Sequence, residues 1–174
     1  TWKTYPEFES RLWNALSENL ARIRRFTLPE GMGTMIRVFL NRFDLLNVKL
    51  ALRAVHEEKP FVPVPLGSLH DEGLLEDMSR VKTLPDLAAH LPAAGLGEYG
   101  DVLSDVKDLD EKTILDLERV LDGFYNERWV KTLGSLDEGP LLVRVQGIFI
   151  DYANLRAVFR LVTGGRGAVS ENIF

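Results

Sequence analysis

One ten-residue phrase occurs twice in this chain, and it restricts the fold more than any other feature of the sequence. The first copy runs from Asp44 to Arg53 and the second from Asp151 to Arg160, and both read D-x-x-N-apolar-basic-x-x-apolar-R. On a helix, the Asp, the Asn and the apolar residues of each copy share one side. The repetition predicts that one helical building block is used more than once.

The far side of each predicted helix carries two cations at i and i+4, namely Lys49 with Arg53, and Arg156 with Arg160. Like charges at this spacing destabilise an isolated helix by roughly 0.2–0.5 kcal/mol, so each basic ridge requires a compensating environment. Acidic neighbours within the chain, such as Glu118 or Asp122, would supply one. An open polar face that awaits an acidic partner would be the other. The four cations are therefore candidate partner-binding residues.

The apolar side of each copy carries two polar residues, Asp44 with Asn47 and Asp151 with Asn154. Both helices are expected to be largely buried, and polar groups on a buried face need partners. We interpret these four residues as a structural motif that bonds helix ends or neighbouring polar groups at the junction between units. This interpretation is favoured over direct binding of a ligand.

The rest of the chain is also predicted to be helical, because apolar residues recur every three or four positions. The expected helices are 5–26, 33–56, 71–81, 84–91, 110–132 and 141–163, with 92–100 as a loop or short turns. Prolines at 60, 63 and 65 leave residues 61–67 extended or irregular. Thr83 and Asp86 form a capping box, and Gly164-Gly165 ends the last helix. Residues 141–145 alternate as a strand would, but their position matches residues 35–39 and favours helix.

The predicted fold class is therefore all-α, built from repeated helical units. Residues 1–70 form the first unit, residues 71–109 form connecting short helices, and residues 110–174 form the second unit. Each unit is a long helix, a turn of six to eight residues, and a second helix that carries the D-x-x-N phrase in its middle.

Composition and motifs exclude several function classes. The chain has 45% hydrophobic and 27% charged residues, as globular proteins do, and its net charge of −5 argues against nucleic-acid binding. It has no cysteine for disulfides or thiolate metal sites, and no run of ~20 apolar residues. His56, His70 and His90 are scattered without the spacing of metal ligands. We predict no catalytic residue, no metal and no cofactor.

Four segments in order resemble the C subunit of the bacterial and archaeal V-type (A-type) rotary ATPases, which is called the d subunit in eukaryotes. They are residues 42–53, the extended segment 61–69, residues 82–87 and residues 151–160. The resemblance implies a funnel-shaped helical protein without catalytic activity, cytoplasmic and peripheral to the membrane. Such a protein is a socket that couples the central stalk to the proteolipid rotor ring during proton or sodium transport. Its partners would be the stalk subunits and that ring.

Members of this family contain three such helical units, whereas two are recognisable here. The sequence is therefore expected to be a fragment that lacks flanking parts of the full-length protein. A function of another class remains open, in which the chain is a helical-repeat adaptor that binds a peptide or partner protein.

Overall fold

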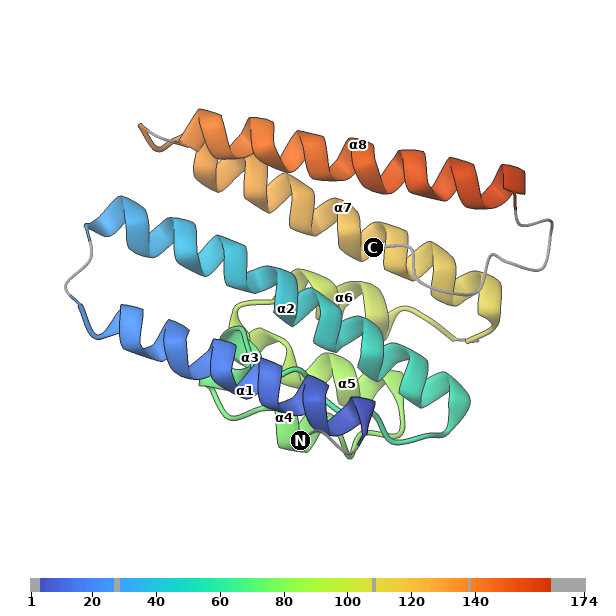
Figure 1. Ribbon diagram of the computed structural model, residues 1–174. Helices are drawn as coiled ribbons and strands as arrows, with labels where there is room; N and C mark the ends of the chain where they lie inside the picture. Colours follow the sequence, from blue (N-terminus) through green and yellow to red (C-terminus); the bar gives the residue numbers. More distant parts are fainter. Residues whose placement is uncertain (1–3, 27–28, 108, 138, 164–174) are drawn as a thin grey trace. The chain divides into compact units, whose positions relative to one another are not determined.

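The computed structural model describes residues 4–26, 29–107, 109–137 and 139–163 of the chain (Figure 1). The protein is 77% helical, and no strand occurs in the described residues, which confirms the all-α prediction. Within the same residues, every helix is too short or too polar to cross a membrane. Side chains of a few helical residues, including Arg160, lie outside the description.

The chain divides into two compact units, Thr1–Arg128 and Trp129–Phe174. In the described part of the chain, the first unit holds six α-helices, a 3₁₀ turn and most of helix α7, and the second holds the end of α7 and helix α8. This division follows contacts between residues, so it does not test the repeat boundaries predicted at 70/71 and 109/110. Those boundaries remain a prediction.

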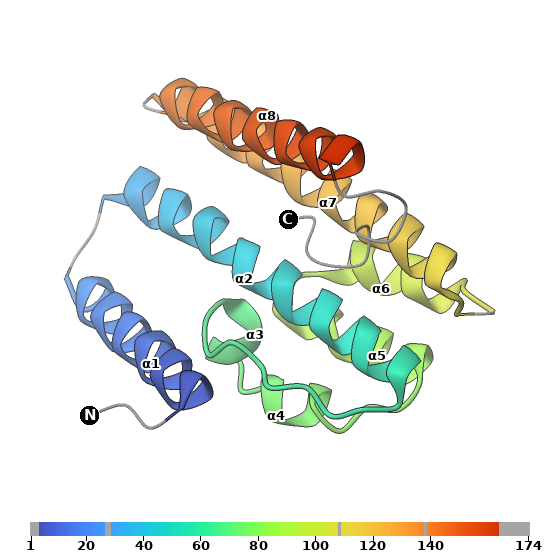
Figure 2. The same cartoon turned by 45° about the vertical axis from the view of Figure 1, so that its right-hand side comes forward.

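Helices α1 (Tyr5–Arg24) and α2 (Glu30–Glu57) run antiparallel in the first unit (Figures 1 and 2). The Thr4 side chain caps α1 by accepting a hydrogen bond from the Glu7 N–H. The Trp13 ring meets the Phe43 ring edge to face, with centroids 5.7 Å apart. Both helices agree with the ranges predicted from apolar spacing. The extended prediction for residues 61–67 also holds, because none of them is helical.

Four short helices lie along α2: α3 (Ser68–Asp71), α4 (Leu75–Met78), α5 (Leu84–His90) and α6 (Gly97–Ser104), with a 3₁₀ turn at Pro92–Ala94 (Figure 2). The capping prediction for α5 is confirmed, since the Thr83 hydroxyl oxygen accepts from the Asp86 N–H. Two predictions are wrong. The helix expected at 71–81 is split into α3 and α4, because Gly73 adopts a left-handed φ of 73°. The loop expected at 92–100 contains the start of α6.

Helix α6 was not predicted from the sequence, because no local signal marks its first residue. It begins at a glycine, has no side-chain cap, and carries an acidic residue in its first turn only at Glu98. Its buried residues, Tyr99, Gly100 and Leu103, instead pack it into the first unit. A Cβ at Gly100 would lie 2.9 Å from the Ala88 carbonyl oxygen, so α5 and α6 approach closely. Tertiary packing therefore holds this helix.

The core of the first unit gathers around the middle of α2. Its fully buried side chains come from α2, α3, α4, α5, α6 and α7, with Leu91 and Leu96 between helices. They are Val48, Ala51, Leu52, Leu69, Met78, Leu87, Leu91, Leu96, Leu103 and Leu121. The apolar arc predicted for the first D-x-x-N copy is thus the centre of this core.

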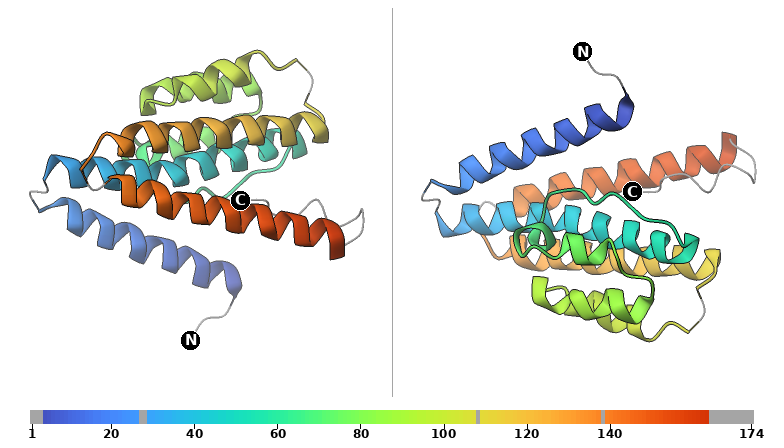
Figure 3. Two further views of the ribbon diagram at one scale, coloured as in Figure 1. Left: turned by 90° about the horizontal axis from the view of Figure 1, so that it is seen from above. Right: turned by 90° about the horizontal axis from the view of Figure 1, so that it is seen from below.

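Helix α7 (Glu111–Gly134) and helix α8 (Gly139–Thr163) confirm the two long helices predicted near the end of the chain (Figures 1 and 3). The chain reverses between them. A Cβ at Gly139 would lie only 1.4 Å from the Leu133 carbonyl oxygen, so the turn requires glycine there. Residues 141–145 are helical, as expected, and the predicted stop at Gly164-Gly165 falls outside the described residues.

Candidate functional site

Asp44, in the middle of α2, bonds the beginning of another helix. Its side chain is fully buried, and its two carboxylate oxygens accept hydrogen bonds from the Ser68 and Leu69 N–H groups, each 2.9 Å long. These N–H groups open α3 and have no acceptor within that helix. Burial raises the pKa of Asp44 above its ordinary value, although the two backbone hydrogen bonds oppose the rise.

Asn47, one turn further along α2, pairs with the extended segment that precedes α3. Its Oδ1 accepts from the Val64 N–H at 2.8 Å, and its Nδ2 donates to the Val64 carbonyl oxygen at 2.9 Å. Prolines flank Val64 on both sides, so its N–H is an isolated backbone donor, and Val64 itself is buried. The amide of Asn47 thus acts as a neighbouring strand would.

Gly67 lies between the residues that contact Asn47 and those that contact Asp44. No role was predicted for it from the sequence. Its φ is 98°, and a Cβ there would lie 2.2 Å from Oδ1 of Asp44. Only glycine offers both the left-handed backbone and the space. The signal was present in the sequence, because a glycine follows the last of three closely spaced prolines. Nothing in the sequence indicates that the Asp44 carboxylate occupies the space that a side chain at position 67 would need.

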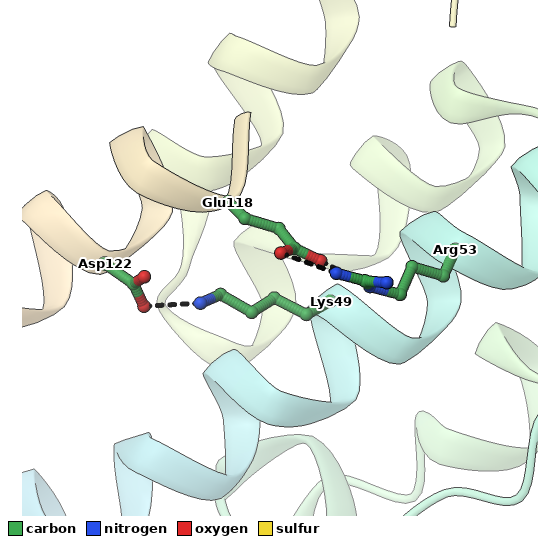
Figure 4. Close-up of polar contacts among 4 residues, drawn as sticks. All are labelled: Lys49, Arg53, Glu118 and Asp122. Atoms are coloured by element: carbon green, nitrogen blue, oxygen red, sulfur yellow. Dashed lines mark hydrogen bonds and ion pairs between the residues drawn. The ribbon is translucent and has the colours of Figure 1, made fainter. Parts of the chain in front are cut away.

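The first basic ridge is neutralised inside the first unit (Figure 4). Lys49 Nζ lies 2.5 Å from Oδ1 of Asp122, and Arg53 forms two hydrogen bonds with the Glu118 carboxylate, at 2.6 and 2.9 Å. Glu118 and Asp122 are themselves four residues apart on α7, so the i, i+4 spacing of one helix matches that of the other. These are the two acids considered as internal partners from the sequence.

The electrostatics of this cluster follow from partial burial. Burial raises the pKa of Asp122, while the Lys49 ammonium opposes that rise. The hydrogen bond from Arg53 to Glu118 raises the pKa of the guanidinium, which stays charged. The side chains of Lys49 and Glu118 are only 13% and 10% exposed, so solvent screens these pairs less than it screens surface pairs. The cluster therefore clamps α2 to α7.

The second copy of the phrase lies in a different environment, which corrects the expectation that both helices are largely buried. Asp151, Asn154 and Arg156 are exposed on α8. Leu155 is 59% exposed, whereas Val48 at the same position of the first copy is fully buried. The two phrases agree in sequence and helix type, but no described segment covers the second as residues 64–69 cover the first. Arg160 is helical, and its side chain lies outside the description.

Within the described residues, no group of three or more His, Cys, Asp or Glu side chains is placed to hold a metal ion. The His56 ring lies 3.0 Å from the Leu109 carbonyl oxygen, so it has a backbone partner. A depression beside α2 is lined by mixed apolar and charged side chains, including Phe26, Arg37 and Asp71. These charges do not converge on a reacting atom. The polar chemistry of the described chain is that of joints between helices.

Comparison with known proteins relates the chain to a subunit family of ATP synthases. The family model for the ATP synthase (C/AC39) subunit matches residues 3–174. The A-type ATP synthase C subunit of Methanocaldococcus jannaschii is 28% identical over 148 residues, which cover 80% of this chain and 36% of that protein. Its counterpart in Methanosphaera stadtmanae, also an A-type ATP synthase C subunit, is 27% identical over 172 residues, covering 91% and 43%.

The chain therefore spans less than half the length of these curated relatives. No solved structure gives a significant match to it. Because the family model covers nearly the whole sequence, the chain belongs to the ATP synthase (C/AC39) subunit family.

Proposed function

We propose that this chain belongs to the non-catalytic central rotor subunit of a rotary V-type or A-type ATPase. In this role it is a socket that couples the central stalk to the membrane proteolipid ring during proton or sodium transport. The observation that carries the proposal is the family match over residues 3–174, together with relatives named as C subunits of A-type ATP synthases. The subunit would lie at the cytoplasmic face, peripheral to the membrane through the ring.

The internal joints of the first unit suit a part that transmits torque. A socket must not yield when the stalk turns, and hydrogen-bonded, buried polar groups fix one arrangement of the elements that they connect. Asp44 and Asn47 fasten residues 64–69 to α2, and two ion pairs fasten α7 to α2. All of these groups face other parts of the same chain, so they serve rigidity and leave docking to other residues.

Docking is better assigned to the second basic ridge. Lys49 and Arg53 already have acidic partners within the chain, whereas Arg156 is exposed on α8. We therefore place the partner-binding role at Arg156 and Arg160, which would meet acidic groups of the stalk foot. Complementary charge of this kind favours rapid and correctly oriented association.

The test reverses both charges in the full-length protein and measures binding to the purified central stalk. Arg156→Glu with Arg160→Glu should weaken binding at low salt, and the loss should shrink at high salt because ions screen exposed charges. Arg144→Glu is the matched control, since Arg144 is an exposed arginine on the same helix at a different angle around its axis. An equal loss in the control, or unfolding of the double variant, would refute the docking role.

A pull-down separates the rotor role from the adaptor alternative. Recovery of stalk subunits and a proteolipid ring supports the rotor socket. Recovery of one linear peptide ligand in their place supports a helical-repeat adaptor.

A further inference from the structure

We draw no further inference here: the strongest candidate, the depression beside α2 that is lined by Phe26, Ile36, Arg37, Asp71 and Glu72, carries exposed charges of both signs, and nothing in the described part of the chain shows what would fill it.

Discussion

Replacing Asn47 by Ala tests whether the first D-x-x-N phrase holds the extended segment in place. The native amide accepts from the Val64 N–H at 2.8 Å and donates to the Val64 carbonyl oxygen at 2.9 Å. In the variant the Val64 N–H loses its partner in a buried site. The Val64 carbonyl keeps one hydrogen bond, from the Leu66 N–H at 2.8 Å. One orphaned donor therefore dominates the cost.

The magnitude follows from burial. An unsatisfied buried donor costs about 1–3 kcal/mol. Asn47 is fully buried, so truncation also leaves a small void beside the segment, which adds to the loss. We expect Asn47→Ala to lower the free energy of unfolding of the first unit by about 2–4 kcal/mol. Asn154→Ala is the matched control, because the same residue at the same place in the phrase is exposed on α8. It should change stability by less than about 0.5 kcal/mol.

Urea unfolding followed by circular dichroism at 222 nm measures both variants, and native-state hydrogen exchange of the Val64 amide reports the local opening. Asn47→Ala should lower the urea midpoint and speed exchange at Val64, while Asn154→Ala should do neither. Equal effects of the two variants would refute the reasoning, because it derives the cost from burial and not from the phrase. Unchanged Val64 exchange in Asn47→Ala would refute it as well.

Three further predictions concern the neighbouring groups. Gly67→Ala should lower the free energy of unfolding by roughly 2 kcal/mol or more, because it combines a left-handed φ with a Cβ 2.2 Å from Asp44; an unchanged thermal midpoint would contradict this. Arg53→Met should cost about 1–2 kcal/mol, after allowance for the partly exposed guanidinium, and Glu118→Met added to it should recover part of that loss in urea unfolding. Carboxyl ¹³C titration should place the midpoint of Asp44 above about 3.9 and that of Asp110, which accepts hydrogen bonds from Thr113, below it. Since the folded-state pKa of Asp44 exceeds the unfolded-state value, its contribution to stability should be lost as the pH rises through the interval between them.

The helical fold and most helix bounds were predictable from the sequence for a local reason. A 3.6-residue spacing of apolar residues indicates a helix with one apolar side, whatever that side packs against. A proline or a capping residue such as Thr83 fixes a helix end through contacts within a few residues of itself. The all-α class, α1, α2, α5, α7 and α8 followed from such signals. Helix α6 did not, because it starts at a glycine without a cap and is held by packing.

The residues of the candidate site were predictable from the sequence, but which residue pairs with which was not. The repeated phrase singled out Asp44 and Asn47, and Glu118 and Asp122 were expected only in general as internal acids that could neutralise a basic ridge. The hydrogen bonds of Asp44 and Asn47 join positions 17 to 25 residues apart, and the ion pairs join positions 65 and 73 residues apart. Contacts of this range depend on how the chain returns to the helix, which no local pattern encodes.

By itself, the sequence determined that two helices present the same set of side chains on one side. The spacing of these hydrogen-bonding and apolar residues along a helix fixes which of them share a side, whatever lies around the helix. Only the tertiary structure decided that these equal faces have different environments. The face on α2 is covered because a proline-rich segment folds back onto it, whereas the face on α8 is exposed. The physical reason is that burial depends on what another part of a chain supplies, and not on the helix that is buried.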